Sequence, residues 1–360
     1  MSDPSPSATS GSGARPVPTS KPVDLPPLPP DVAVSVVMPV LNEERHLAEA
    51  VRAVLDQDYA GPIDVALALG PSSDRTDEVA QALREQDSRV TLVPNPTGRT
   101  PHALNAAVAA TSSPVVVRVD GHGVLDPDYV ATAVELLRET GAANVGGLMD
   151  AEGSTPFEQA VAAAMTSVLG VGAARFHVGG SAGPADTVYL GVFRREWLRH
   201  VGGYDPEFVR AQDWEMNHRI RKAGGLVWFS PRLRVSYRPR STVRALARQY
   251  RDYGRWRRVV ARTHAGSLNP RYLAPPLALL GVVVGAVVGV TLTPWGLVLP
   301  GGYVGVVLLG TALAGRGGRL PLRARALLPV VLPTMHLCWG WGFLTSPASL
   351  VPHAEVPESE

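Results

Sequence analysis

The sequence predicts an α/β protein in which a mostly parallel sheet domain is followed by a helical transmembrane region. From residue 32 to about residue 230, short apolar runs alternate with helical patterns, as in chains that build a sheet from strand–helix units. The runs are apolar at nearly every position, which favours parallel strands covered on both faces. From Tyr272 to Gly315 the chain contains no Asp, Glu, Lys or Arg. That stretch is long enough for two bilayer crossings of about 20 residues each.

The first 30 residues are rich in Pro, Ser, Thr and Gly. Such a segment buries too little apolar surface to offset its ordering entropy, so residues 1–30 are expected to form a disordered tail. They contain no apolar signal-peptide core, and no cleaved signal peptide is expected.

The sheet domain is expected over residues 31–240. Strands are predicted at residues 32–40, 63–69, 90–93, 114–120 and 144–149, and helices at residues 43–55, 74–86, 100–111 and 127–140. Residues 186–208 then predict a strand, a short helix and a turn, which lead into a helix within residues 210–225. Ligands of such sheets bind outside the carboxyl ends of the strands, so the loops that follow the strands are the candidate site.

Residues 241–271 predict a basic amphipathic helix. Its apolar and aromatic stripe consists of Val243, Leu246, Tyr250, Tyr253, Trp256 and Val260, and the adjacent row of arginines consists of Arg244, Arg248, Arg251, Arg255, Arg258 and Arg262. This pattern indicates an interfacial helix on anionic lipid, with Arg248 and Arg251 as candidates for binding an acceptor's phosphate. The alternative is a helix docked on the sheet domain with a solvated charged face.

The transmembrane region is expected over residues 272–346. Two spans are predicted at residues 273–292 and 295–314, and a third apolar segment at residues 326–345 either spans the membrane or re-enters it. The segment between the second and third carries Arg316, Arg319, Arg323 and Arg325, which places it in the cytoplasm by the positive-inside rule. We therefore expect a multi-pass protein of the cell membrane with a cytoplasmic catalytic domain and an acidic tail at residues 347–360.

The composition argues against a nucleic-acid-binding protein and against a disulfide-stabilised one. The formal net charge is only +2, which argues against a nucleic-acid partner, and the single cysteine, Cys338, excludes a disulfide framework. Nearly all of the basic residues are arginines, which suit phosphate recognition, although codon bias explains the same excess.

Three clusters of polar residues could carry chemistry. Arg99 stands beside the start of the third helix, where a phosphate could bind. Asp120 and His122 follow the fourth strand and could hold one divalent cation, Mn²⁺ or Mg²⁺; the alternative is a turn cap and a surface histidine. Gln212, Asp213 and Glu215 open a helix, where acidic residues serve either as caps or as a catalytic base.

These motifs together resemble those of a known family. The segments VSVVMPVLNEERHLAEAVRAVLDQ, SSDRTDEV, the strand ending in DGH, and GGYDPEF with QDWEMNHRIRKAGG occur in the order found in family 2 glycosyltransferases of the GT-A fold. More narrowly, the chain resembles succinoglycan-type enzymes that extend lipid-linked sugars, which also carry an HLxWGxGF-like element, here His336–Phe343. The resemblance covers roughly residues 33–345. It implies inverting transfer of a sugar from a UDP- or GDP-sugar to a membrane-associated, polyprenyl-linked acceptor in glycan or exopolysaccharide biosynthesis.

The resemblance also implies roles for individual residues. Pro39, Asn42, Glu43, Asp74 and Asp120 would bind the donor, and Asp120 with His122 stands where the family's DXD metal motif lies. Asp213 stands at the general base, with Gln212 where Glu is commoner. Gln249, Arg255 and Trp256 resemble the QxxRW motif of processive synthases with a longer spacing, and together with Gln212 they are candidates for binding the acceptor or its phosphate. The chain departs from many relatives at Leu69-Gly70-Pro71, where they carry an Asp-Asp pair that contacts the nucleotide base.

Other functions fit parts of the pattern. A polyprenyl-phosphate glycosyltransferase or a processive polysaccharide synthase would use the same domain, although three spans are few for a translocation channel. A catalytically inactive membrane scaffold that binds nucleotide-sugars is the alternative outside enzymes, and it would need neither Asp120 nor Asp213.

Overall fold

The computed structural model describes residue 23, residues 25–314 and residues 320–350. Within that part of the chain, nine strands form one sheet in the order β3-β2-β1-β4-β8-β6-β9-β5, with β7 paired to β9. The strands are β1 (Val34–Val40), β2 (Ile63–Leu69), β3 (Val90–Pro94), β4 (Val115–Arg118), β5 (Val124–Leu125), β6 (Asn144–Ala151), β7 (Gly183–Pro184), β8 (Tyr189–Arg194) and β9 (Val227–Tyr237). β1 to β4 pair in parallel, and β8 lies antiparallel between β4 and β6. The predicted mostly parallel sheet is therefore confirmed.

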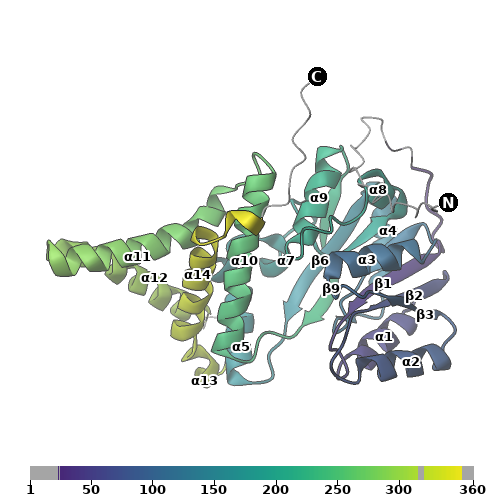
Figure 1. The fold of residues 1–360 in the computed structure, drawn as a ribbon, viewed down its shortest axis with the longest axis horizontal. Helices are drawn as coiled ribbons and strands as arrows, with labels where there is room; N and C mark the ends of the chain where they lie inside the picture. The colour runs from purple at the N-terminus through teal and green to yellow at the C-terminus, as the bar shows by residue number, and fades with distance from the viewer. Residues whose placement is uncertain (1–22, 24, 315–319, 351–360) are drawn as a thin grey trace, which may run out of the picture.

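Helices cover both faces of this sheet (Figure 1). The buried side chains of α1 (Leu47–Leu55), α2 (Thr76–Gln86) and α4 (Tyr129–Thr140) form a core with one face. Those of α3 (Thr100–Ala109), α8 (Arg195–His200) and α9 (Gln212–Lys222) form a second core with the other face. Two covered faces explain why the strands are apolar at successive positions rather than at alternate ones.

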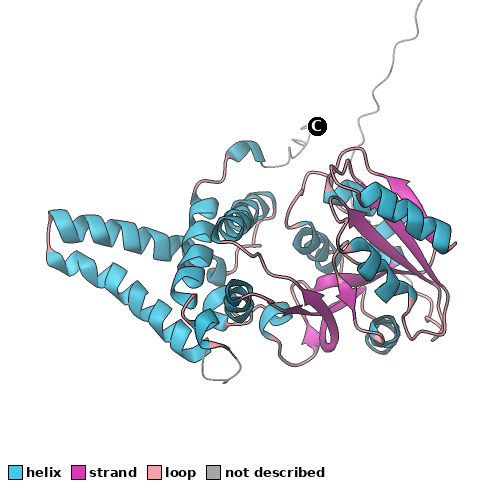
Figure 2. Ribbon diagram, turned by 90° about the horizontal axis from the view of Figure 1, so that it is seen from below, coloured by secondary structure: helices cyan, strands magenta, loops and turns pink. Residues whose placement is uncertain are grey.

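The C-terminal part is helical. It comprises α10 (Val243–Thr263), α11 (Ala274–Thr291), α12 (Val298–Ala314), α13 (Leu322–Arg325) and α14 (Leu328–Leu344), with short 3₁₀ helices at Pro270–Leu273, Pro294–Leu297 and Ala348–Leu350. α11 and α12 form a hairpin that projects away from the sheet domain (Figure 2). Three helices in this region are long and apolar enough to cross a membrane: Pro270–Thr291, Pro294–Ala314 and Leu322–Leu344.

A third core joins the two parts of the molecule. α5 (Pro156–Met165) precedes two single-turn helices, α6 (Val168–Val171) and α7 (Arg175–Val178). Buried residues of α5 pack with Leu246 and Tyr250 of α10 and with Leu328 and Met335 of α14. Because Val260 is also buried against Phe208 of the sheet domain, most of the apolar stripe of α10 is covered by protein. This arrangement matches the docked-helix alternative for α10, and a position at the lipid surface stays a prediction.

Among the boundaries that differ from the sequence-based expectation, two have a clear cause in the structure. Leu28 is buried in the main core and its carbonyl oxygen accepts a hydrogen bond of 3.0 Å from Arg138 Nε, so residues 25–30 belong to the sheet domain. α1 begins at Leu47 rather than at residue 43, because the preceding residues bond to a neighbouring loop. Residues 1–22 and 24, Arg316, Arg319 and residues 351–360 of the predicted tails and connecting segment lie outside the described residues.

Candidate active site

The candidate site is the edge of the sheet at which β1, β2, β3 and β4 end. Because these four strands are parallel, the loops that follow them lie side by side in the order β3, β2, β1, β4. Neighbouring strands are about 4.8 Å apart, so the loops after β2 and β4 are about 10 Å apart. An extended ligand could therefore contact both loops.

Hydrogen bonds join the loops after β1 and β2 into one unit. Asn42 has a left-handed backbone (φ 57°), which asparagine tolerates better than most residues, and its side-chain oxygen accepts a 2.8 Å hydrogen bond from the Ser73 backbone N–H. The next N–H, that of Glu43, donates to Thr76 Oγ1 at 2.7 Å. These bonds turn the chain away from helical geometry and hold the Glu43 side chain toward the loop after β4.

Asp74 stabilises the same loop. Its Oδ1 accepts hydrogen bonds from the Thr76 hydroxyl at 2.5 Å and the Thr76 backbone N–H at 3.1 Å, and its Oδ2 accepts from the Glu44 N–H at 3.3 Å. The hydrogen bond from the Thr76 hydroxyl is the main reason that the pKa of Asp74 lies below its usual value. In the structure Asp74 is thus a loop-ordering residue, and direct contact with a donor stays a prediction.

His122 contacts the loop after β1. Its Nδ1 lies 2.7 Å from Glu43 Oε1, and this hydrogen bond is the main cause of a raised His122 pKa. Gly121 makes the approach possible, since a Cβ atom there would lie 2.9 Å from Glu43 Cγ. In the described chain no other hydrogen bond reaches the imidazole, so Nε2 is available to a ligand.

Arg118 links the two predicted catalytic carboxylates. It is the last residue of β4 and only 4% exposed. Its Nη2 donates to Asp120 Oδ1 at 2.9 Å, and its Nη1 donates to Asp213 Oδ1. One guanidinium therefore holds Asp120 and Asp213 close together, although 93 residues separate them in the chain.

The pKa values of the two carboxylates are shifted in opposite directions. Burial by itself would raise the pKa of Asp120, but the positive charges of Arg118 and His122 outweigh it and lower that pKa. For Asp213, burial and then the nearby Asp120 charge outweigh the attraction of Arg118, so its pKa is raised. Asp120 is thereby kept as an anion, and Asp213 is made the better proton acceptor.

Asp213 and Glu215 face different parts of the protein, as their separation of two positions on α9 predicts. Glu215 is fully buried and forms an ion pair with Arg219, with Nη2–Oε2 and Nε–Oε1 distances of 2.6 Å. His264 Nε2 lies 3.4 Å from the same carboxylate. The ion pair with Arg219 therefore engages both oxygens of Glu215. Gln212 is half-buried in the first turn of α9.

α10 contacts β9 and the segment that precedes α9. Gln249 Nε2 donates to the hydroxyls of Tyr237 at 2.9 Å and Tyr253 at 2.8 Å, and the Trp256 ring lies 6.3 Å from that of Phe208. Arg255 faces Asp252 of its own helix, with a closest distance of 3.9 Å. Arg248 and Arg251 are exposed on α10, and the Arg251 carbonyl oxygen lies against α14 at Gly342. The structure thus brings Gln249 to β9 and Trp256 to the cluster before α9, and leaves Arg248 and Arg251 outside both contacts.

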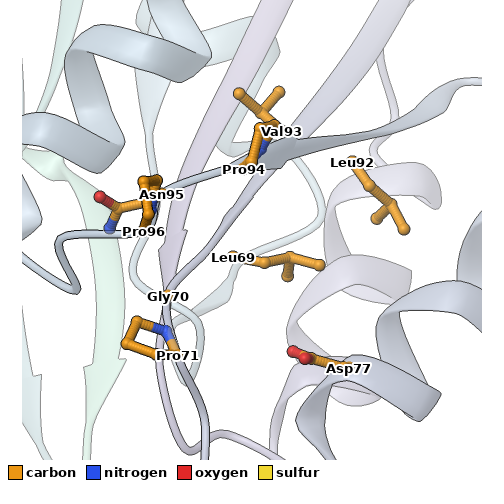
Figure 3. Close-up of a pocket in the computed structure, with 9 residues that line it drawn as sticks. All are labelled: Leu69, Gly70, Pro71, Asp77, Leu92, Val93, Pro94, Asn95 and Pro96. Atoms are coloured by element: carbon orange, nitrogen blue, oxygen red, sulfur yellow. The ribbon is translucent and has the colours of Figure 1, made fainter.

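A shallow cavity of about 420 Å³ opens at the carboxyl ends of β2 and β3 (Figure 3). Its lining is mostly apolar and consists of Leu69, Gly70, Pro71, Asp77, Leu92, Val93, Pro94, Asn95 and Pro96. Leu69, Gly70 and Pro71 are the residues at which the family resemblance implied a departure from an Asp-Asp pair. Gly98 packs against Gly70 and Pro71, which places the exposed Arg99, the residue before α3, next to this cavity along the chain.

The residues after β4 fit a divalent cation. Hydrogen bonds within the described chain reach only Oδ1 of Asp120, whose side chain is 23% exposed, so Oδ2 is available. A histidine that binds a metal through one nitrogen typically donates from the other to a carboxylate, as His122 does to Glu43. No group of three His, Cys, Asp or Glu side chains converges in residues 25–314 or 320–350, so a cation here would need ligands from a bound molecule.

Sequence reasoning missed two features of this site. Arg118 was recognisable as a charge inside the apolar run VVVRVD, since a buried arginine requires a partner. β9 gave only a partial signal, because Pro231 and two arginines interrupt the strand-favouring residues of VWFSPRLRVSY.

The chain belongs to glycosyl transferase family 2 and is a glycosyltransferase with a GT-A-like fold. The family model matches residues 35–202. Over 314 residues the chain is 32% identical to the succinoglycan biosynthesis protein ExoA of Rhizobium meliloti (strain 1021), an alignment that covers 86% of this chain and 93% of that protein.

Two more distant relatives extend the comparison. A dolichyl N-acetyl-alpha-D-glucosaminyl phosphate 3-beta-D-2,3-diacetamido-2,3-dideoxy-beta-D-glucuronosyltransferase of Methanococcus voltae is 22% identical over 86% of this chain and 95% of its own length. The mannosyltransferase PcManGT from Pyrobaculum calidifontis, solved with GDP-Man and Mn²⁺, is similar in fold, with a TM-score of 0.54 and 20% identity. That match covers 90% of this chain and 91% of the solved one.

Proposed function

We propose that the protein is an inverting, membrane-bound glycosyltransferase of polysaccharide biosynthesis. It moves a sugar from a nucleotide-diphosphate sugar to a polyprenyl-linked acceptor at the cytoplasmic face of the cell membrane. The observation that carries this proposal is the bridge from Asp120 through Arg118 to Asp213, because it places a donor-side carboxylate beside a carboxylate suited to act as a base.

Asp213 is the proposed base. In a direct displacement the acceptor hydroxyl attacks the anomeric carbon while the nucleotide diphosphate leaves, so inversion results. The hydroxyl must lose its proton near the transition state, and Asp213 can take that proton at Oδ2 while Arg118 holds Oδ1. The raised pKa of Asp213 strengthens it as an acceptor for that proton.

Asp120, His122 and Glu43 form the proposed diphosphate end of the site. Asp120 Oδ2 and His122 Nε2 would hold a Mn²⁺ or Mg²⁺ ion, and Glu43 would orient the imidazole. When bound, such an ion offsets the negative charge that develops on the leaving diphosphate. The Mn²⁺ in the PcManGT complex supports this choice of cofactor.

The cavity after β2 and β3 is the proposed site of the nucleobase. It lies on the far side of β1 from Asp120, the direction in which the loop after β1, with Pro39 and Asn42, would support the nucleoside. Arg99 would contact the nucleotide at the start of α3. GDP-Man in the PcManGT complex supports a nucleotide-sugar donor, and this proposal includes both UDP- and GDP-sugars.

Three observations support a membrane acceptor on the cytoplasmic side. The candidate spans follow the catalytic domain and α10, and the name of the Methanococcus relative specifies a dolichyl phosphate-linked sugar as its acceptor. Arg323 and Arg325 precede α14, and arginines gather on cytoplasmic segments.

The test compares two carboxylates of one helix in washed membranes supplied with labelled nucleotide-sugars and extracted lipid acceptors. Asp213→Asn should lower kcat by at least about a hundredfold while donor binding is kept, as expected for loss of a base. Glu215→Gln, the matched control, should change stability more than kcat, because Glu215 pairs with Arg219. An inactive Glu215→Gln with an active Asp213→Asn would contradict the assignment.

The same assay separates the alternatives. Label transferred to bare polyprenyl phosphate would indicate a polyprenyl-phosphate glycosyltransferase, and a long polymer from one acceptor would indicate a processive synthase. Donor binding without transfer to any lipid would indicate a scaffold.

A further inference from the structure

The third candidate span, α14, differs from the other two in its surroundings. α11 and α12 expose large apolar side chains along most of their length, and only 11% of each candidate span is buried. For the span that contains α14 the buried share is 39%. In Figures 1 and 2 the hairpin of α11 and α12 runs crosswise to α14, which lies alongside α10 next to the sheet domain.

The backbones of α10 and α14 are in contact. A Cβ atom on Gly254 of α10 would lie 2.0 Å from the Trp339 carbonyl oxygen, and a Cβ on Gly342 of α14 would lie 2.0 Å from the Arg251 carbonyl oxygen. Only a glycine, which has no side chain, lets the backbones of two helices come this close. α10 and α14 therefore lie at the same depth relative to any membrane.

α10 cannot lie in hydrocarbon. It carries Arg244, Arg248, Arg251, Asp252, Arg255, Arg257, Arg258 and Arg262 along its length, and four of its arginines are exposed. Charged side chains are strongly disfavoured at the centre of a bilayer. If α14 crossed the bilayer, α10 would also have to enter the hydrocarbon, because the two helices are packed together.

The start of α14 is attached to the catalytic domain, and the segment after its end is attached to α10 and to the catalytic domain. At its start, Ala324 and Leu328 share a core with Ala160 and Val161 of α5. At its end, Arg262 donates to the carbonyl oxygens of Ser346 at 3.0 Å and Pro347 at 3.1 Å.

Beyond that end, Leu350 packs against the cluster of Phe208, Val259 and Val260. Phe208 belongs to the catalytic domain and lies five residues before Asp213. A helix that is attached to one water-soluble domain at its start and just after its end cannot have its ends on opposite sides of a membrane.

The exposed face of α14 suits the membrane surface. Val330, Trp341 and Leu344 are 47%, 54% and 44% exposed. Positions 330, 341 and 344 share one helix face, because 11 residues make three turns and the next exposed position is three further on. α11 begins beside α14, because a Cβ atom on Gly340 would lie 2.5 Å from the Pro275 carbonyl oxygen. Tryptophan is enriched at the level of lipid headgroups.

We propose that only α11 and α12 cross the bilayer, and that α14 lies in the membrane interface beside α10. Residues 346–350 are then on the same side of the membrane as the catalytic domain. The exposed arginines of α10 meet anionic headgroups at that surface. This topology goes beyond the proposed function, and its test needs no enzymatic activity.

The experiment is cysteine labelling of the full chain in intact cells, in a Cys338→Ala background. Three exposed positions report on the three locations: Thr91→Cys on β3, Leu292→Cys at the tip of the hairpin and Ser349→Cys after α14. A membrane-impermeant maleimide is applied before and after permeabilisation, which also verifies that each thiol reacts.

We expect labelling of Leu292→Cys in intact cells and labelling of Thr91→Cys and Ser349→Cys only after permeabilisation. Labelling of Ser349→Cys but not Thr91→Cys in intact cells would overturn the topology, and so would a Leu292→Cys that is protected together with Thr91→Cys. Labelling of both Thr91→Cys and Ser349→Cys in intact cells, with Leu292→Cys protected, would support the topology and refute the cytoplasmic placement in the proposed function.

Discussion

Removal of the Arg118 guanidinium tests the organisation of the site most directly. In Arg118→Met a buried strand position keeps a long apolar side chain, while Asp120 and Asp213 lose the cation that both of them bind. Breaking a buried ion pair by removing one partner costs about 3–5 kcal/mol. The carboxylate side chains are 23% and 30% exposed, so water screens part of the repulsion and the lower end, about 3 kcal/mol, applies.

This loss of stability can be measured as a decrease in the melting temperature of the protein in detergent. For a domain of this size, 1 kcal/mol corresponds to about 2–4 °C, so the melting temperature should fall by about 6–12 °C. Adding Asp213→Asn to Arg118→Met removes one of the two like charges and should restore at least about 2 °C.

The matched control is another arginine–carboxylate pair of the same chain. Arg232 and Glu135 are 2.8 Å apart, and their side chains are 51% and 44% exposed. Because exposed pairs contribute at most about 1 kcal/mol, Arg232→Met should shift the melting temperature by less than about 4 °C. Equal shifts for Arg118→Met and Arg232→Met, or further destabilisation in the double variant, would refute the reasoning.

Three further predictions concern activity. The acid limb of the pH–kcat profile should lie above the ordinary pKa of an aspartate, because the pKa of Asp213 is raised and the base must be ionised. Since Arg118 lowers the pKa of Asp213, Arg118→Met should move this limb to higher pH. A limb that does not move would show that another group titrates. Asp120→Ala should abolish Mn²⁺ binding measured by electron paramagnetic resonance and nearly all activity, whereas full activity in chelator would exclude a metal role. Charge reversal of Arg248 and Arg251 to Glu should raise the apparent acceptor KM and lower sedimentation with anionic vesicles, and if neither changes, these arginines are solvated surface.

The strand pattern could be predicted locally because burial on both faces leaves a nearly continuous apolar run in β1, β2 and β4. β9 escaped prediction for a physical reason. Pro231 and two arginines interrupt its run, and the register between β6 and β9 shifts between Gly146 and Leu148, so no single period describes the segment. The start of α1 was also misplaced, because Glu43 donates its N–H to Thr76 of another loop instead of entering the helix.

The sequence by itself determined the fold class, the apolar segments and the chemical identity of the carboxylates at Asp120 and Asp213, since each depends on residue types within one short stretch. Only the tertiary structure decided that Arg118 binds both carboxylates, that Glu43 reaches His122, and that α14 is attached to the catalytic domain at its start and just after its end. Apart from the Arg118–Asp120 pair, these contacts join residues far apart in the chain, and no local period records them. The apolar length of α14 satisfies the requirement for a membrane span, but the charged helix packed against it and the domain at its two ends set where it can lie.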